Sequence, residues 1–263
     1  MRLENKVAVI TGGDSGIGLA SARLFLAEGA RVAIISNNRK TLDAASALLG
    51  AEVLAIEADV TVPDTLTAAL TQVGARFGHV DVLLPAAGIA SPTPLGATTA
   101  QTVDRLLSIN LSGPFHTVQA ALPYFRPGAS VILMGSVMGS LGPAGLSIYA
   151  ATKAAMVGMA HAMACELTPK GIRVNTIIAG PTESAIWNGL AASPGEARQM
   201  MDGIATTVPM GRLNTTEEVA QVALFLASDQ SRTIHAAELV VDGGLIGAPA
   251  GRIDPALGQE QAA

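Results

Sequence analysis

The sequence predicts an α/β protein, with a doubly wound parallel sheet of about seven strands and helices on both faces, in a single domain. Three observations support this prediction. Short apolar runs recur along the chain, longer segments with apolar residues at helical spacing separate them, and a glycine-rich loop follows the first run directly. Such alternation is typical of a sheet built from βαβ units.

The predicted strands consist mainly of Val, Ile, Leu and Ala. Their apolar positions are continuous rather than alternating, which indicates strands that are buried on both faces, as in a parallel sheet. These strands are expected at residues 7–11, 32–35, 53–56, 82–84, 130–134, 174–178 and 239–241.

Helices are predicted at residues 18–28, 42–49, 65–77, 102–124, 149–167 and 216–228. Thr216 is the expected N-cap of the last one, because a hydroxyl at that position and the acids Glu217 and Glu218 in the first turn stabilise a helix start. Right-handed crossovers between parallel strands put helices on both sides of the sheet. A ligand crevice is then expected at the carboxyl ends of the strands.

The chain is expected to form one domain over residues 1–246, because one sheet with two helical layers accounts for every predicted element. Within it, the segment at about 180–212 is rich in Gly, Pro, Ser, Ala and Met and departs from the strand–helix alternation, so we expect a substrate lid there. Residues 247–263 are predicted to form a C-terminal tail.

Composition argues against several classes of function. Hydrophobic residues make up 49% of the chain and charged residues 14%, which is enough apolar material for a large core. A net charge of -5 and only 3% aromatic residues argue against a nucleic-acid partner. No apolar run approaches the ~18 residues of a membrane span. The single cysteine, Cys165, and the lack of a signal-peptide pattern predict a cytoplasmic protein.

A glycine-rich loop joins the first predicted strand to a helix. Glycines allow a sharp turn and a close approach of the backbone to a pyrophosphate, and the helix start offers free N–H groups to phosphate oxygens. A Rossmann-type dinucleotide site is therefore predicted, because the loop lies between a strand and a helix. Its candidate residues are Gly12, Asp14, Ser15, Gly16, Ile17 and Gly18.

The end of the second predicted strand bears on which dinucleotide binds. An acid there would accept the 2′-hydroxyl of the adenosine ribose in an NAD enzyme, but the chain has Ser36, Asn37 and Asn38 followed by Arg39. These side chains can donate to a 2′-phosphate, so NADP(H) is favoured and NAD(H) remains the alternative. Asp14, in the loop nearby, opposes this preference through its negative charge.

A candidate catalytic group is formed by Tyr149, Lys153 and Ser136. Tyr149 and Lys153 are four residues apart at a helix start and therefore share one helix face. An adjacent ammonium favours the phenolate of a tyrosine and can adapt it to acid–base chemistry. Ser136 ends the preceding strand and reaches the same crevice, where its hydroxyl can bond a substrate oxygen.

Taken with further motifs, these residues resemble the short-chain dehydrogenase/reductase family over residues 6–244. The resemblance implies that Tyr149 is the general acid/base, that Ser136 positions the substrate oxygen, and that Lys153 binds the nicotinamide ribose and tunes Tyr149. The motifs that carry it are the glycine loop at 11–18, Asp59-Val60, Ala87-Gly88, Asn110, Ser136, Tyr149 with Lys153, Arg173-Val174-Asn175 and Val241-Asp242-Gly243-Gly244.

The same resemblance implies further roles. Asn110 would hold the water of a proton relay, Asp59 would contact the adenine with Val60 packed beside it, and Ala87 and Gly88 would border the cofactor. Tyr149 and Lys153 would touch the cofactor as well as the substrate.

The chain departs from the family pattern at two positions. Pro85 and Ala86 replace the usual residues before Ala87-Gly88, so an asparagine that braces the sheet is missing, and a slightly looser cofactor site is expected. After the sixth strand, Gly180 with Thr182 or Ser184 is expected to serve the carboxamide end of the cofactor.

The expected partner is a small apolar ketone or secondary alcohol. Trp187 in the lid is the leading candidate for substrate contact, together with Met138, Ser136 and Tyr149. No residue pattern indicates a metal site. A catalytically silent dinucleotide sensor is the rival function, and it would be marked by loss of one of the three catalytic side chains.

A homotetramer or homodimer is also expected. Relatives in the family commonly pair the helix that carries the catalytic tyrosine. Met156, Met159 and Met163 form a candidate packing face on that helix.

Overall fold

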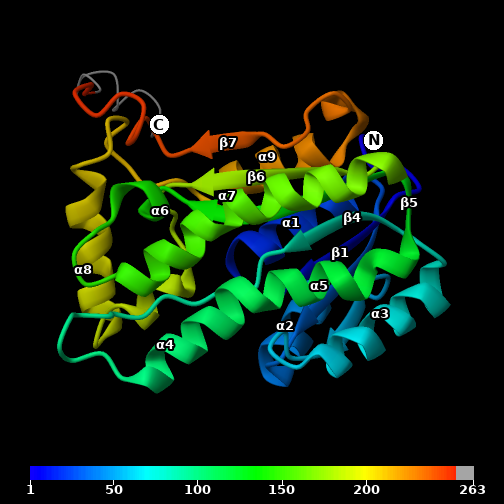
Figure 1. Cartoon of the computed structure of the whole chain (residues 1–263), viewed down its shortest axis with the longest axis horizontal. Coiled ribbons are helices and arrows are strands. Elements are labelled where there is room, and N and C mark those ends of the chain that lie inside the picture. The colour runs from blue at the N-terminus through cyan, green and yellow to red at the C-terminus, as the bar shows by residue number, and fades with distance from the viewer. Residues whose placement is uncertain (253–263) are drawn as a thin grey trace.

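The computed structural model describes residues 1–252 and contains one parallel sheet of seven strands in the order β3-β2-β1-β4-β5-β6-β7 (Figure 1). Strand order reverses between β1 and β4, which pair side by side although β2 and β3 separate them in sequence. This reversal is the switch point at which doubly wound sheets bind ligands. The strands are β1 Val7–Thr11, β2 Arg31–Ser36, β3 Leu54–Glu57, β4 Val80–Pro85, β5 Phe125–Ser136, β6 Arg173–Ala179 and β7 Glu238–Val241.

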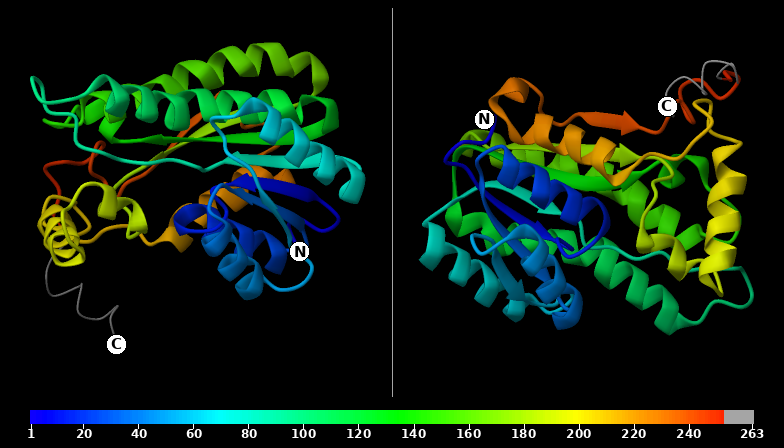
Figure 2. Two further views of the ribbon diagram at one scale, coloured as in Figure 1. Left: turned by 90° about the horizontal axis from the view of Figure 1, so that it is seen from below. Right: turned by 180° about the vertical axis from the view of Figure 1, so that it is seen from behind.

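The helices cover both faces of the sheet (Figure 2). On one face α1, α2 and α9 enclose a core that contains Phe25 and Leu42, and on the other face α3, α5 and α7 enclose a second core with Leu70 and Leu133. The central strands are buried from both sides, as their continuous apolar runs predict, whereas the edge strands β3 and β7 are partly exposed. The helices are α1 Gly16–Ala27, α2 Arg39–Leu49, α3 Pro63–Phe77, α4 Ala100–Leu107, α5 Gly113–Ala121, α6 Met138–Leu141, α7 Ser147–Leu167, α8 Pro194–Ala205 and α9 Thr216–Ala227.

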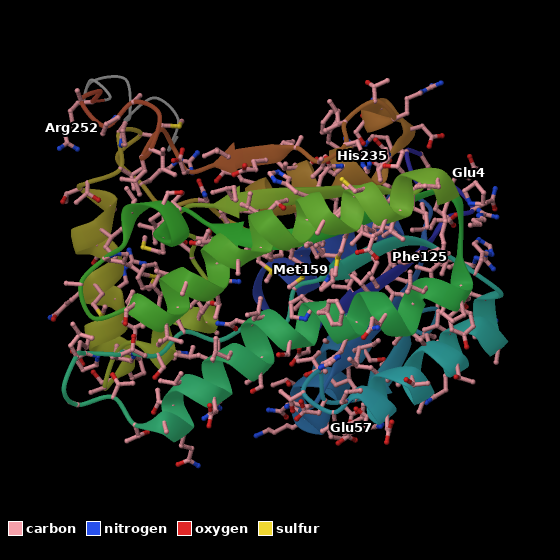
Figure 3. All side chains as sticks on the ribbon, in the orientation of Figure 1. Glu4, Glu57, Phe125, Met159, His235 and Arg252 are labelled. Atoms are coloured by element: carbon pink, nitrogen blue, oxygen red, sulfur yellow. The ribbon has the colours of Figure 1, made fainter. Side chains whose placement is uncertain are left out.

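The methionine face of α7 packs within the subunit. Met156 and Met163 are buried, and Met159, labelled in Figure 3, packs against the core of this face. The prediction that these residues form a packing face is therefore correct, but they serve the chain's own core, and the suggested contact with a second subunit is wrong for Met156 and Met163.

A single helix at 102–124 is not what the chain forms. α4 ends at Leu107, a π-helical turn spans Ser108–Ser112, α5 follows, and a short 3₁₀ turn closes at Tyr124. Pro114 explains the break, because it has no N–H to donate to the carbonyl of Asn110, four residues earlier. The π turn therefore lies at Asn110.

The N-cap of α9 is Thr215 rather than the expected Thr216. Thr215 forms a capping box with Glu218, whose carboxylate accepts the Thr215 N–H at 2.8 Å. Arg212, at the end of the lid, bonds the same carboxylate at 2.7 Å, and this bond holds the pKa of Glu218 down at about 2. The lid is thereby tied to the body of the protein where α9 begins.

The predicted lid contains a 3₁₀ turn, Ala185–Gly189, and the helix α8. Residues 247–252, at the start of the predicted tail, lie against the lid. The Arg252 guanidinium donates to the Thr206 carbonyl at 2.8 Å. The rest of the tail lies outside the described residues. Within residues 1–252, every helix is too short or too polar to cross a membrane.

Candidate active site

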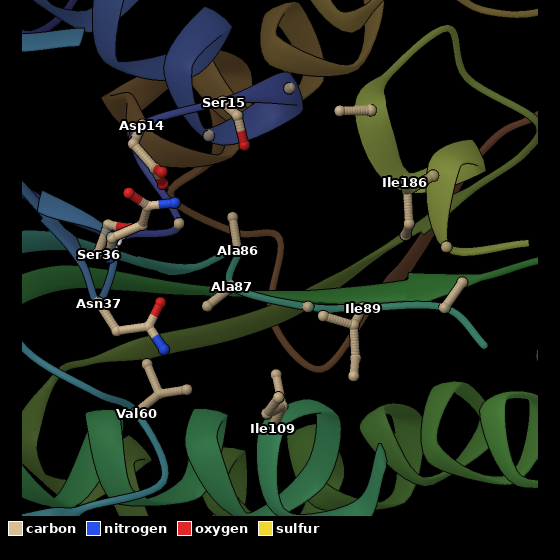
Figure 4. A pocket seen from close by; sticks show the side chains of 18 of the residues that line it. Asp14, Ser15, Ser36, Asn37, Val60, Ala86, Ala87, Ile89, Ile109 and Ile186 are labelled. Carbon is tan, nitrogen blue, oxygen red and sulfur yellow. Dashed lines mark hydrogen bonds between the residues drawn. The ribbon is translucent and has the colours of Figure 1, made fainter. Parts of the chain in front are cut away.

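A cavity of about 780 Å³ opens at the carboxyl ends of the strands, at the switch between β1 and β4 (Figure 4). Its wall is built by the loops after β1, β2, β3 and β4, by α4 and by the start of the lid. A volume of this size accommodates a dinucleotide-sized ligand. The sheet reversal, the cavity and the glycine loop therefore coincide, as the sequence predicts for a doubly wound fold.

The glycine loop has the geometry of a phosphate cradle. Gly12 has a φ of 65°, and a Cβ there would lie 2.7 Å from the Ala87 backbone, so only glycine fits. Ser15 is the N-cap of α1 but makes no side-chain cap hydrogen bond, and the first turn of α1 contains no acid. This helix start borders the cavity, which Ser15, Gly16, Ile17 and Gly18 line. The residues present thus fit a bound pyrophosphate.

The missing asparagine of the β4 end is partly replaced by Thr11. The Ala86 N–H donates to the Thr11 carbonyl at 3.0 Å, and the Ala87 N–H reaches the Thr11 hydroxyl at 3.5 Å. β1 and β4 are therefore joined beyond the last strand pair. Ala86, Ala87 and Gly88 all line the cavity.

One end of the cavity is polar and contains Asp14, Ser36, Asn37 and Asn38, with Asp59 and Val60 beside them. Burial acts to raise the pKa of Asp59, but hydrogen bonds from Asn37 and Thr61 hold it below its usual value. Figure 4 shows Asp14, Ser36 and Asn37 together at this end, with Val60 below them. We call this polar end the adenosine end, because in doubly wound folds the second strand meets the adenosine ribose.

Arg39 is not part of the cavity wall. Its Nε lies 2.9 Å from Asp43 one turn further along α2, and its side chain is 64% exposed. The pKa of Arg39 is raised, chiefly by the hydrogen bond with Asp43. The predicted preference for NADP(H) rested in part on the positive charge of Arg39, and that charge is paired with Asp43 instead.

The candidate catalytic trio, Ser136, Tyr149 and Lys153, lies at the carboxyl end of β5 and the start of α7. None of the three is among the residues that line the cavity, but Lys153 lies next to Gly88, which does. Burial raises the pKa of Tyr149 to about 12, and a hydrogen bond with Ser136 acts in the opposite direction. The sequence led us to expect the ammonium of Lys153 to favour the phenolate; the structure gives the reverse direction because burial dominates. The phenol is therefore protonated at neutral pH.

Lys153 lies beneath the tyrosine ring. Its Nζ donates to the Met134 carbonyl at 3.1 Å, and burial lowers the pKa of Lys153 to about 8. A Cβ at Gly88 would lie 3.8 Å from this nitrogen, so the glycine keeps the approach to the ammonium open.

Asn110 is buried at the π turn and faces the same region. Its side chain bonds the backbone of Ile89 twice, donating to the carbonyl at 2.8 Å and accepting from the N–H at 2.9 Å. These two bonds fix the segment that follows β4. Pro114, four residues further on, has no N–H to donate to the carbonyl of Asn110.

The residues expected at the carboxamide end separate into two groups. Ser184 lines the cavity, whereas Thr182 is buried beneath it, with its hydroxyl donating to the Gly180 carbonyl at 3.0 Å. Gly180 packs on Asp242, and a Cβ there would lie 2.6 Å from the Asp242 Cα. Of the three, only Ser184 is exposed to the cavity.

Trp187 does not line this cavity, although its neighbour Ile186 does. The indole is 7% exposed, donates to the Thr182 carbonyl at 2.8 Å, and packs with Ala197 and Leu213 inside the lid. Met138 starts α6, and its N–H donates to the Ser136 hydroxyl at 3.2 Å.

Part of the cavity wall was not expected from the sequence. Gln101, Thr102 and Arg105 of α4 line it, as do Ser91 and Ile109. The spacing of the first three places them on one helix face, which is the signal that locates them once α4 is known to follow β4. In residues 1–252, no group of three or more His, Cys, Asp or Glu side chains is arranged to hold a metal ion.

Comparison with known proteins agrees with this geometry. A family model described as enoyl-(acyl carrier protein) reductase matches residues 12–246. The oxidoreductase asL5 of Sarocladium schorii is 39% identical over 93% of this chain and 97% of its own length. The 3-oxoacyl-[acyl-carrier-protein] reductase FabG of Thermotoga maritima is 37% identical over 94% of this chain and 100% of its own.

A solved structure, a glucose/ribitol dehydrogenase of the short-chain dehydrogenase/reductase type from Brucella melitensis, superposes with a TM-score of 0.87. It is 33% identical and covers 93% of this chain and 98% of its own. The chain belongs to the short-chain dehydrogenase/reductase family. It is thus an oxidoreductase of a family that uses nicotinamide cofactors and acts on alcohols and ketones.

Proposed function

We propose that this protein interconverts an apolar ketone and the corresponding secondary alcohol, with Tyr149 as the general acid/base. The observation that carries the proposal is the buried Tyr149 side chain, with Ser136 close enough to lower its pKa and the Lys153 Nζ 5.7 Å from the centre of its ring. The nicotinamide cofactor, when bound, supplies the hydride or accepts it.

The protein's own part in the reaction is the handling of a proton and of the substrate oxygen. Because Tyr149 is protonated at neutral pH, its hydroxyl can give a proton to the oxygen of a ketone, and Ser136 can donate a second hydrogen bond to that oxygen. The Lys153 ammonium lies beneath the ring and stabilises the phenolate that forms when the proton leaves. In alcohol oxidation the phenolate takes the proton back.

Asn110 is proposed to serve the return of that proton. Pro114 removes the α-helical donor to its backbone carbonyl, which is proposed to hold a water, while its side chain keeps the segment at Ile89 in place. A water held there would connect the catalytic lysine to solvent.

Two cofactor preferences have separate support. NADP(H), the preference predicted from the sequence, is supported by the lack of an acid at Ser36–Asn38 and by the proximity of Arg39 in sequence. NAD(H) is supported by Asp14, whose carboxylate is on the cavity wall while Arg39 is not. Both dinucleotides fit the pyrophosphate cradle and the adenine contacts proposed for Asp59 and Val60.

The substrate pocket is proposed to lie between the catalytic trio and the lid, with Met138 and Ile186 as its apolar contacts. Trp187 then acts on the substrate only through the lid that it packs. A silent dinucleotide sensor is the rival function, and the presence of Ser136, Tyr149 and Lys153 argues against it.

We further propose a cytoplasmic homotetramer or homodimer. The exposed apolar side chains of Val240, on the edge strand β7, and Phe115, on α5, support an assembly that covers them.

The test of the proposed function is a screen of neutral ketones and secondary alcohols with NADH, NADPH and their oxidised forms, followed by absorbance of the reduced nicotinamide. We expect turnover with apolar substrates by the wild type and none above background by Tyr149→Phe. Tight dinucleotide binding without turnover of any substrate would favour the sensor.

A further inference from the structure

We infer that Asp14 accepts the 2′-hydroxyl of the adenosine ribose and thereby makes this protein select NAD(H) over NADP(H). The inference rests on the dinucleotide site of the proposed function. In many NAD enzymes an acid at the end of the second strand accepts this hydroxyl. This chain has no acid there, and Asp14 of the glycine loop takes that role.

Asp14 is positioned for this task by its neighbours. It lies between Gly12 and Gly16 in the glycine loop. Its side chain lines the cavity at the adenosine end, beside Ser36 and Asn37 (Figure 4). The Thr41 hydroxyl donates to one oxygen of its carboxylate at 2.6 Å and so orients the group from α2. Within the described residues no hydrogen bond reaches its other oxygen, which remains available to a donor in the cavity.

Two of the side chains that were expected to donate to a 2′-phosphate, Asn37 and Arg39, donate to carboxylates instead. The Asn37 amide nitrogen donates to Asp59 at 3.0 Å. The Asn38 side-chain oxygen caps α2 by accepting the N–H groups of Lys40 and Thr41 at 3.1 and 3.3 Å. The start of α2 thus offers fewer free N–H groups to an anion than an uncapped helix would.

The charges around the adenosine end also oppose a phosphate. Asp14 and Asp59 are both on the wall, and of the residues that line the cavity Arg105 alone carries a positive charge. Arg105 belongs to α4, whereas Arg39 and Lys40 on the first turn of α2 are off the wall, with Arg39 paired to Asp43. A dianionic 2′-phosphate would therefore meet carboxylate, whereas a 2′-hydroxyl would meet an acceptor.

Calorimetric binding tests the inference without turnover. The full chain is titrated with NAD⁺ and NADP⁺, and with the fragments 5′-AMP and adenosine 2′,5′-bisphosphate, which differ only at the 2′ position. The wild type should bind NAD⁺ and 5′-AMP at least about tenfold tighter than their 2′-phosphorylated counterparts. Equal affinities, or tighter binding of the 2′-phosphorylated pair, overturn the inference.

The key variant is Asp14→Asn, which keeps the shape and removes the charge. It should weaken NAD⁺, strengthen NADP⁺ and reduce their affinity ratio at least about tenfold. Asp14→Ser should do the same and serves if the first variant folds poorly. A ratio that stays within about threefold of the wild type in both variants overturns the inference.

Two controls separate contact from distant charge. Asp43→Asn removes the same charge from α2 off the cavity wall and frees Arg39, and Arg39→Gln removes the rival cation; both should leave the ratio within about threefold. If Asp43→Asn matches Asp14→Asn, or Arg39→Gln abolishes NADP⁺ binding, Arg39 is the determinant and the inference fails. Turnover of ketones in the wild type decides the proposed function independently of every one of these affinities.

Discussion

The Nζ of Lys153 lies 5.7 Å from the centre of the Tyr149 ring, one turn further along α7. Burial moves the pKa values of the two groups apart, raising that of Tyr149 to about 12 and lowering that of Lys153 to about 8, because it disfavours the phenolate of one and the ammonium of the other. Strongly shifted values of this kind beside a cavity are typical of a catalytic site.

Tyr149→Phe should abolish most of the turnover while leaving cofactor binding unchanged. Phenylalanine preserves the buried ring but has no proton to transfer, so kcat should fall by ~10²–10⁴-fold. The matched control is Tyr124→Phe, the only other tyrosine, whose hydroxyl reaches Thr71 of α3 at 3.4 Å near the amino end of β5, away from the carboxyl ends of the strands. A Tyr149→Phe enzyme with more than about a tenth of wild-type kcat would contradict the mechanism.

The pH profile of ketone reduction should report Lys153. Its ammonium is present below a pKa of about 8 and is lost above it, so kcat/KM should be level near neutrality and decline at alkaline pH. Lys153→Met should have a low kcat/KM at every pH, without the decline at alkaline pH. The measurement is kcat/KM from pH 6 to pH 10 with circular dichroism at each point, a range of roughly two units on either side of the transition. A wild-type profile that stays level through the alkaline range would count against this assignment.

The buried Lys153 should also lower the free energy of unfolding at neutral pH. Its pKa falls from 10.5 to about 8 on folding, so the unfolded chain binds more protons between these values, and wild-type stability should rise with pH across that window. Lys153→Met removes the penalty and should stabilise the cofactor-free protein by roughly 3 kcal/mol at pH 7. The control is the exposed Lys170→Met at the end of the same helical region, which should change little.

Urea denaturation of both variants near pH 7 and near pH 10 measures this effect. The gain of Lys153→Met over the wild type should shrink at the higher pH. A less stable Lys153→Met at neutral pH, or a gain that does not depend on pH, would contradict the burial penalty.

Trp187 and Ile186 should have separable effects. Trp187→Phe loses the indole bond to Thr182 at 2.8 Å and should lower the stability by about 1 kcal/mol. Because the ring packs inside the lid, KM should rise alike for small and bulky ketones. Ile186→Ala, on the cavity wall, should change KM for bulky ketones selectively. The measurement is KM for a series of ketones of increasing size. If Trp187→Phe raises KM for bulky ketones more than for small ones, Trp187 contacts the substrate.

The order of the secondary structure could be predicted because it depends on local patterns. Continuous apolar runs identified all seven strands, and β1 begins and ends where expected, at Val7–Thr11. The long segment at 102–124 was mispredicted as one helix because Pro114 is compatible with the start of a second helix, and apolar spacing does not reveal the π turn at Asn110.

The candidate catalytic trio could also be predicted, since the spacing of Tyr149 and Lys153 determines their shared helix face and Ser136 ends a strand. The direction of the Tyr149 pKa shift could not, because it depends on how deeply α7 is buried. The same holds for Trp187, whose type suits a pocket wall but whose partners, Thr182 and Leu213, become neighbours only when the lid folds.

The sequence by itself determined the order of the strands along the chain, the glycine loop and the candidate catalytic side chains, because each depends on a local pattern of residues. Only the tertiary structure decided which polar groups remain free at the adenosine end. Asn37 is taken up by Asp59, Arg39 by Asp43, and one oxygen of Asp14 by Thr41. Burial, and competition among neighbours brought together by the fold, set these partnerships, and neither can be read from residue type alone.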